Sequence, residues 1–418
     1  MLKDKILLVL ILISFIVGLI LGEDTLGGGK HDYLYHVKYF ENFHLNFKET
    51  FLNYGSDQIN DNVRNSPIFY IFFSLFLNLG LDTFGLKIIN LFLLLPIFYF
   101  LNKCIDLKYP NTPLIIKLYF FSLLLLSPTI RTLFSWPYPL LWALAFFIIS
   151  IYFYLKFEIS INENKKMNFA YLNIICLASA AYFTPNFSVF SIYFFYRFYL
   201  NYKNSFKTLK IVFLNIFLSL PAIIFIISKD FYLFDSNVKY VSDIQKYNIT
   251  NKIIIITSII FIFILPLISN IQKIKEDSIF SNLISYKSFF LIAFFIINIY
   301  FFNFSENVGG GIIFRISNLL FDNSYFIFLI FGFSLLIFYF LKLYNINNIL
   351  LFSLLIIYNI QYEIYYKYFD PLIILLLFFL IKYEEKKFIK MDLIIKKYVL
   401  LYIVFLMLNF MKGYIDYY

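Results

Sequence analysis

Long apolar runs without charged residues recur along almost the whole chain, and they limit its possible folds more than any other feature. Many of these runs approach the ~20 residues that a helix needs to cross a hydrocarbon layer about 30 Å thick. Membrane-spanning strands would need segments of ~10 residues in which apolar and polar residues alternate. The runs here are continuously apolar, so the pattern predicts an all-α, polytopic transmembrane helical bundle.

The composition favours a membrane protein over a water-soluble one. Of the 418 residues, 61% are hydrophobic and 14% are charged, whereas globular chains are roughly 45–50% apolar and ~25% charged. The net charge of +10 has no basic soluble domain to carry it, so it gives no sign of a nucleic-acid partner. Cys104 and Cys176 lie in or beside hydrophobic segments and predict neither a disulfide framework nor a metal site.

About 13 segments are predicted to span the membrane. The first, 5–22, has no A-x-A-like cleavage site after it, so we expect it to be retained as a helix. Segment 66–81 is expected to re-enter the membrane, lie at its surface or join the following span. The other predicted spans are 85–102, 112–128, 136–157, 167–184, 186–200, 206–228, 252–271, 288–304, 324–342, 348–363, 368–383 and 396–412.

The basic residues between these segments predict the orientation. Loops rich in Lys and Arg stay in the cytoplasm, and most of the 35 basic residues fall on that side if the N-terminus is cytoplasmic and 66–102 makes one net crossing. The sequence thus predicts one multi-pass transmembrane domain, 1–418, in the cell's plasma (inner) membrane. Its largest extracytoplasmic loop is 23–65.

This first outside loop holds the residues best suited to acid–base chemistry. Apolar residues recur at near-helical spacing from Tyr33 to Phe51, which predicts a helix lying in the membrane interface. Asp32 and His36 are four residues apart and would project from one face of that helix. A carboxylate beside an imidazole is a familiar acid–base pair. The alternative is a solvated helix whose polar residues only hold it at the surface.

Four short motifs add a family resemblance. They are Asp32-Tyr33 in the loop, Pro67-Ile68-Phe69-Tyr70 at its end, Gly85 with Lys87 at the next helix, and Tyr366-Lys367-Tyr368-Phe369-Asp370-Pro371 late in the chain. Together with the first helix and the large outside loop, they resemble the GT-C superfamily of integral-membrane glycosyltransferases, which includes protein O-mannosyltransferases and the aminoarabinose transferases of lipid A. The late motif of that superfamily usually has an Arg where this chain has Lys367. Its first loop has a pair of acidic residues, and Tyr33 stands in the second position of that pair.

The resemblance implies an enzyme that moves a sugar from a polyprenyl-phosphate donor to a glycan, lipid or protein acceptor on the extracytoplasmic face. Asp32 would be the general base, with His36 as its partner or as a contact of the acceptor, and Tyr33 would contact substrate. Cations would stabilise the leaving phosphate as negative charge develops there. The candidates on the outer side are Arg64, Arg131, Arg315 and Lys367.

Each of these cations also has a simpler explanation. Arg131 could anchor its Pro-broken turn at the interface, and Lys367 could belong to a local ion network with Glu363 and Asp370. Arg315 follows Gly309, Gly310 and Gly311, whose irregular backbone at membrane depth would line a cavity or be buried in protein.

No cofactor is firmly indicated. Some superfamily members use Mg²⁺ or Mn²⁺, and the first outside loop offers oxygen and nitrogen ligands in Glu23, Asp24, Asp32, His31 and His36. Two other functions remain open: a polysaccharide polymerase or ligase, and a transporter or flippase of lipid-linked glycans. A transporter should place charged residues in the middle of its helices. Here they cluster at helix ends and in loops, which favours chemistry on one side of the membrane.

Overall fold

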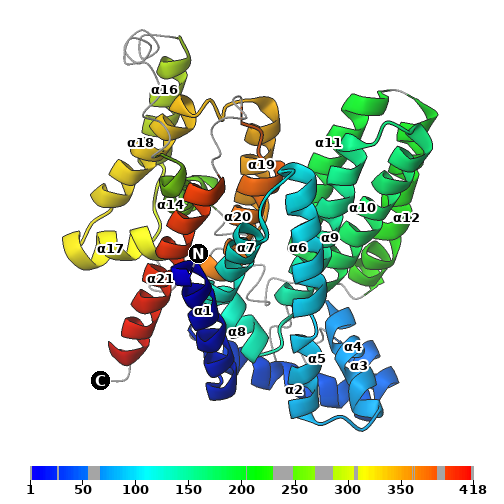
Figure 1. The fold of residues 1–418 in the computed structure, drawn as a ribbon. Coiled ribbons are helices and arrows are strands. Elements are labelled where there is room, and N and C mark those ends of the chain that lie inside the picture. Colours follow the sequence, from blue (N-terminus) through cyan, green and yellow to red (C-terminus); the bar gives the residue numbers. More distant parts are fainter. Residues whose placement is uncertain are drawn as a thin grey trace. The chain divides into compact units, whose positions relative to one another are not determined.

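Helices make up the regular structure of the described part of the chain, and no strand occurs there (Figure 1). The computed structural model describes residues 2–25, 28–54, 66–203, 205–228, 248–268, 286–305, 309–359, 361, 363–383 and 391–415. The predicted all-α class is therefore confirmed for these residues.

Several of the described helices are long and apolar enough to cross a membrane, which identifies a membrane-embedded protein. Five described helices have the length and apolar composition that a membrane span requires: Asp4–Leu21, Thr83–Lys108, Pro139–Ile159, Phe206–Ser228 and Ile249–Leu267. A sixth would be the pair Leu114–Leu126 and Pro128–Ser135, which is bent by 69°. The predicted number of about 13 spans is not confirmed, because several other apolar helices in the described ranges have only 10–17 residues.

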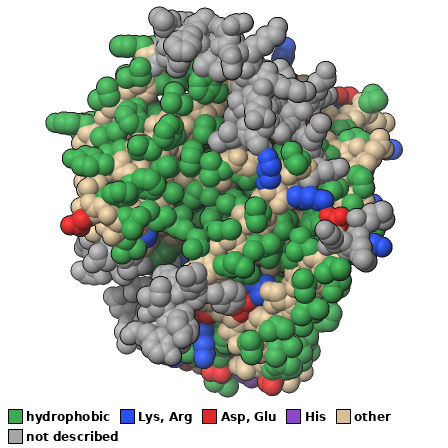
Figure 2. Space-filling model, turned by 60° about the vertical axis from the view of Figure 1, so that its left-hand side comes forward, with side chains coloured by type: hydrophobic (Ala, Val, Ile, Leu, Met, Phe, Trp, Pro, Cys, Tyr) green, Lys and Arg blue, Asp and Glu red, His purple; other side chains and the backbone are tan. Residues whose placement is uncertain are grey.

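Apolar side chains on the surface fit this conclusion. The helix over 206–228 buries only 6% of its most apolar window, and the first helix buries 17%. Figure 2 shows one face of the molecule on which hydrophobic side chains dominate the described surface. In water such exposure would be unfavourable, whereas lipid tails are as apolar as these side chains.

The chain divides into two compact units, 1–242 with 399–418, and 243–398. The helix α21 (Met391–Ile415) crosses the boundary between them. The first unit contains α1 (Leu2–Leu21), α2 (Gly29–Leu45), α3 (Phe47–Asn53), α4 (Pro67–Asn78), α5 (Thr83–Leu91), α6 (Leu94–Lys108), α7 (Leu114–Leu126), α8 (Pro128–Ser135), α9 (Pro139–Ile159), α10 (Glu163–Phe183), η1 (Pro185–Val189), α11 (Phe190–Tyr202) and α12 (Phe206–Ser228).

One end of the first unit collects the start of α2, the end of α1, the start of α5, and α8. We call it the α2 end. It is defined by contacts of Glu23 with Arg131, of Tyr33 with the backbone of Thr83, and of the His36 ring with Tyr138 at the start of α9. Figure 1 shows α2, α3, α4 and α5 gathered beneath the longer helices of this unit.

The opposite end of the first unit is fixed by a second set of polar contacts. The Tyr119 hydroxyl donates to Asp4 over 2.8 Å, Lys117 pairs with Asp106, and Arg197 pairs with Glu158 at 2.5 Å. The candidate spans α1, α5–α6 and α9 therefore all run between the same two ends, as helices that cross one membrane must.

The predicted interfacial helix in the first outside loop forms as two pieces. Helix α2 ends at Leu45, and Asn46 caps the start of α3 by accepting a hydrogen bond from the Glu49 amide. Helix α2 packs against α4, which has 12 residues and a length of about 18 Å. This is too short to cross a layer of about 30 Å, so α4 does not span the membrane alone.

One described helix that the sequence did not predict is α8. The turn after 112–128 contains α8, in which every residue is buried. Asn90, also fully buried, donates to the carbonyl oxygens of Leu133 and Phe134 near the end of α8. It also accepts from the Trp142 indole over 3.1 Å, so one amide ties α5 to both α8 and α9.

The second unit is arranged around α14. Its helices are α14 (Ile249–Ile268), α16 (Tyr286–Tyr300), α17 (Gly311–Phe321), α18 (Tyr325–Phe340), α19 (Ile346–Ile357), η3 (Tyr366–Tyr368), α20 (Leu372–Leu375) and a short π-helical turn η4 (Leu376–Leu380). Helix α14 contacts α16, α17, α18, α19 and α20. Helix α17 is also unpredicted, since it lies between the predicted spans 288–304 and 324–342.

Candidate active site

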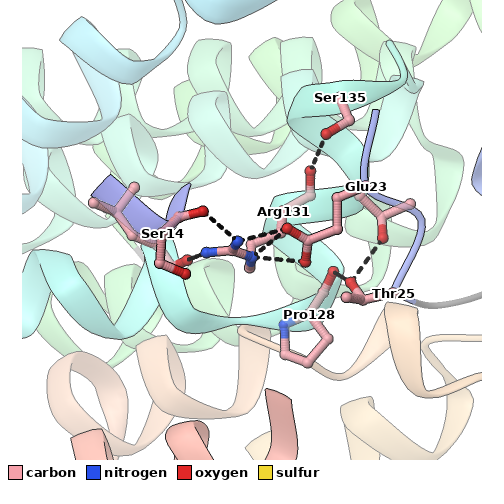
Figure 3. A network of polar contacts seen from close by, with 8 residues as sticks. Ser14, Glu23, Thr25, Pro128, Arg131 and Ser135 are labelled. Atoms are coloured by element: carbon pink, nitrogen blue, oxygen red, sulfur yellow. Dashed lines mark hydrogen bonds and ion pairs between the residues drawn. The ribbon is translucent and has the colours of Figure 1, made fainter. Parts of the chain in front are cut away.

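A buried ion pair forms the base of the candidate site at the α2 end. Arg131 on α8 is 2% exposed and Glu23, just after α1, is 5% exposed. The guanidinium donates from Nε to both carboxylate oxygens, at 2.7 and 2.9 Å, and from Nη2 to Oε2 at 2.5 Å. Its remaining bonds go to the backbone oxygens of Leu125 and Ser14 (Figure 3). The pair thus joins α1, α7 and α8.

Gly18 makes room for this pair. A Cβ at Gly18 would lie 1.9 Å from Glu23 Oε2 and 2.6 Å from Arg131 Nη2. The Glu23 amide also donates to the Gly18 carbonyl over 2.8 Å. Any larger residue at position 18 would displace the carboxylate, so the chain can turn back over α8 only because this position is glycine.

The segment that follows leads directly into α2. Thr25 donates through its hydroxyl to the Pro128 carbonyl over 2.9 Å. The Asp24 carboxylate accepts from the amides of Gly28, Gly29 and Lys30 at 3.0–3.1 Å, which satisfies the free N–H groups at the helix start. A negative charge is also favourable at this end of the helix dipole. Asp24 therefore helps fix where α2 begins.

Asp32 and Tyr33 lie one turn into α2. Asp32 is half-buried, whereas the Tyr33 ring is buried and its hydroxyl donates to the Thr83 carbonyl over 3.2 Å. Burial, and secondarily the Asp82 carboxylate, raise the pKa of the Tyr33 phenol well above its usual value. Tyr33 therefore stays protonated and holds α2 against the start of α5.

His36 does not lie on the polar face of α2 as predicted. It is 4% exposed and surrounded by the rings of Phe69, Tyr70 and Tyr138. Its Nδ1 shares a hydrogen bond of 3.1 Å with the Tyr70 hydroxyl. The packing of α2 on α4 explains the difference, because His36 belongs to the same buried stripe as Phe40 and Phe43.

A cationic and aromatic group lies beside these residues. Lys87 on α5 places its Nζ 3.7 Å from the centre of the Trp136 ring and 5.5 Å from that of Tyr33. Lys30 on α2 reaches the same indole at 5.9 Å. Both ammonium groups are thus held at one aromatic surface by cation–π attraction, which contributes ~0.5–2 kcal/mol per contact. We call Lys30, Lys87, Trp136 and Tyr33 the lysine–tryptophan cluster.

The predicted phosphate contacts are divided between the two units. Arg131 is committed to Glu23 and has almost no exposed surface for a phosphate. Arg315, half-buried on α17, and Lys367, whose Nζ lies over Tyr365 and Tyr368, belong to the second unit. Arg64 lies outside the described residues.

Sequence reasoning missed two features of the site. It noted Gly85 with Lys87 only as part of a motif and gave Lys87 no role. It considered Glu23 as a metal ligand and not as the partner of Arg131. Nothing in the spacing of positions 23 and 131 indicates that pair, because it depends on how α8 folds back.

The described residues give no metal site. Within the described ranges, no group of three or more His, Cys, Asp or Glu side chains is placed to hold an ion. Among the candidate ligands, Glu23 is bound to Arg131 and Asp24 to the first amides of α2.

No protein-family model matches this chain, and neither does any curated protein or solved structure compared with it.

The Glu23–Arg131 pair should dominate the stability of the α2 end. Breaking a buried pair leaves one uncompensated charge, so Glu23→Leu or Arg131→Met should each cost about 3–5 kcal/mol. The double variant should cost clearly less than the sum of the two. Reversible unfolding in mixed micelles measures these free energies.

The exposed Lys207–Glu163 pair, with side chains 40% and 55% exposed, provides the matched control cycle. Its coupling should stay within ~0–1 kcal/mol. Equal coupling energies in the two cycles would contradict a dominant role for Glu23 and Arg131.

Proposed function

We propose that this protein is an integral-membrane glycosyltransferase of GT-C type. It transfers a sugar from a polyprenyl-phosphate donor to a glycan, lipid or protein acceptor at the α2 end. One observation carries the proposal: Asp32 lies in the first turn of α2, directly beside Tyr33 of the lysine–tryptophan cluster in the chain, and this cluster lies where several candidate spans end. A carboxylate on α2 and a cationic, aromatic cluster at the same end of the unit suit a substrate that carries both a lipid-borne phosphate and a sugar.

The distribution of basic residues supports an extracytoplasmic position for this end. The described basic residues at the α2 end are Lys30, Lys38, Lys48, Lys87 and Arg131. A larger set lies at the opposite end, where α6, α9 and α11 finish and α7, α10 and α12 begin: Lys103, Lys108, Lys117, Lys156, Lys165, Lys166, Arg197, Lys203, Lys207 and Lys210. By the positive-inside rule the opposite end is cytoplasmic. The α2 end then faces outward.

The reaction needs a base and stabilisation of a leaving phosphate. Asp32 accepts the proton of an acceptor hydroxyl while that oxygen attacks the anomeric carbon of the sugar. The bond between this carbon and the phosphate oxygen breaks, its electrons stay on the polyprenyl phosphate, and the configuration inverts. Asp32 is half-buried on α2, so it keeps a surface toward an acceptor.

Lys87 and Lys30 supply the positive charge that the leaving group requires. Charge develops on the phosphate in the transition state, and fixed cations stabilise it most strongly where water is partly excluded. The indole of Trp136 and the ring of Tyr33 hold Lys87 in place before substrate arrives. In this arrangement Arg131 is a positioning residue that orients α8, and Trp136 directly follows α8.

Asp32→Asn should lower transfer by about 10²–10⁴-fold, the usual contribution of a positioned base. The assay uses labelled polyprenyl-phosphate sugars and purified full-length protein. Glu41→Gln is the matched control, because Glu41 is an exposed carboxylate on the same helix. Equal turnover by wild type and Asp32→Asn would remove Asp32 from catalysis. No turnover by either protein, over several donors, would favour a flippase.

Lys87→Met keeps the apolar stem of the side chain and removes its charge. Losing one charged contact of ~1.5–3 kcal/mol should lower kcat/KM for the donor by about 10–100-fold. It should also weaken product inhibition by free polyprenyl phosphate. Lys38→Met is the control, since Lys38 is exposed on α2 and its Nζ lies 5.4 Å from the Tyr35 ring. Unchanged inhibition in Lys87→Met would exclude Lys87 as a phosphate contact.

A further inference from the structure

A lysine-rich surface surrounds the start of α12, at the end of the first unit opposite the α2 end. Residues 162–168 and 199–210 contain five lysines and one acidic residue, Glu163. The helices α10, α11 and α12, which carry these residues, pack against one another (Figure 1). The proposed transfer reaction does not use this surface. We call its basic residues the α12 lysines: Lys165, Lys166, Lys203, Lys207 and Lys210.

Side-chain contacts hold two of these lysines around one carboxylate. Lys207 Nζ donates to Glu163 over 2.6 Å, and Lys166 Nζ donates to Asn201 at the end of α11 over 2.8 Å. The hydrogen bond from Lys207, together with the charges of Lys207 and Lys166, lowers the pKa of the Glu163 carboxyl. The other three have no ion-pair partner in the described part of the chain: Lys165, Lys203 and Lys210. The surface is therefore strongly positive.

Helix α12 has an uncovered apolar face that begins at this charge. Its most apolar window is only 6% buried, and the exposed residues Phe206, Phe213 and Phe217 share one helical stripe with Lys210. Lys210 Nζ lies 4.9 Å from the centre of the Phe206 ring, so this side chain runs back toward the start of the helix. A lysine whose stem covers apolar surface while its ammonium group reaches toward water is typical of a membrane interface.

Lys203 stands between α11 and this face. It follows the last residue of α11, and the Thr208 hydroxyl in the first turns of α12 donates to the Lys203 carbonyl. The Lys207 Nζ lies 5.1 Å from the centre of the Tyr202 ring, directly before Lys203 in the chain. Cations from the end of α11 and the start of α12 thus gather where the apolar stripe begins.

We propose that the α12 lysines bind the headgroup of an anionic phospholipid, whose acyl chains lie along the exposed stripe of α12. The phosphate is held by Lys203, Lys207 and Lys210, and the chains contact Phe213 and Phe217. Clusters of about four to eight basic residues beside a membrane-spanning helix are typical of anionic-lipid binding. A zwitterionic headgroup would bring its own cation against the lysines, so the site selects a lipid with a net negative charge.

Lys203 allows one charge to be removed without disturbing the fold. Its φ of +49° and ψ of −137° form a combination that glycine adopts more readily than any residue with a side chain. Lys203→Gly should therefore not lower the melting temperature. Lys210→Gln, at a second exposed position, keeps the test decisive if one variant folds poorly.

The test is native mass spectrometry of the full-length protein in detergent micelles, titrated separately with dioleoyl-phosphatidylglycerol and dioleoyl-phosphatidylcholine. The first phosphatidylglycerol should bind wild type about tenfold more tightly than the first phosphatidylcholine. Lys203→Gly and Lys210→Gln should each weaken phosphatidylglycerol binding about fivefold, which corresponds to ~1 kcal/mol per lysine. Both variants should leave phosphatidylcholine binding unchanged.

Lys103→Gln is the matched control. Lys103 is also exposed, and its Nζ lies 5.7 Å from the centre of a ring four residues earlier, Tyr99, but its helix α6 packs on α7 and α9. This variant should bind phosphatidylglycerol as wild type does. Equal affinity of wild type for both lipids, or an equal loss in Lys103→Gln, would overturn the proposal. Displacement of the lipid by millimolar glycerol 3-phosphate would also overturn it, because the ligand would then be a soluble phosphate. The readout is lipid binding, so the outcome for Asp32→Asn does not affect it.

Discussion

Glu23 and Arg131 are 108 positions apart in the chain, and each is buried where an unpaired charge would be very unfavourable. Removing water from both groups is tolerable only if they meet each other in good geometry. Their three charge-assisted bonds, with Gly18 leaving the space, fix the end of α1 against α8. The start of α2, and with it Asp32, depends on this contact.

The same constraint explains why the polar chemistry collects at the α2 end. Helix α8 is too short to cross a membrane and is buried along its whole length. It bends away from α7 by 69° and ends next to Trp136. The indole then meets Lys87 from α5 and Lys30 from α2. Three segments far apart in the sequence thereby place two cations at one indole, and Asp32 lies in the same first turn of α2 as Lys30.

The sequence could predict the long helices and could not predict their breaks. The span 206–228 matches α12 residue for residue, because its apolar run is bounded by polar residues. The turn after 112–128 was predicted, but helix α8 within it was missed, because Ser127-Pro128 indicated only a break, whereas Ser127 caps a new helix there. Helix α17 was missed because Gly309, Gly310 and Gly311 suggested irregular backbone.

The candidate site was predictable only in part. Asp32 and Tyr33 lie on a helix at the expected loop, since helical spacing is a local property. The roles of His36 and Arg131 depend on which elements pack against them, here α4 and the end of α1. Local spacing contains no such information. Lys87 is held by its cation–π contact with Trp136, which lies 49 positions further along the chain and so could not be inferred from local spacing.

Everything proposed for Asp32 requires the α2 end to face away from the cytoplasm, and cysteine accessibility measures this directly. In a chain with Cys104 and Cys176 replaced by alanine, single cysteines are placed at the exposed positions Lys38, on α2, and Lys165, at the opposite end. A membrane-impermeant maleimide added to intact cells should label Lys38→Cys at once and Lys165→Cys only after permeabilisation. The reverse pattern would place Asp32 in the cytoplasm and contradict the account.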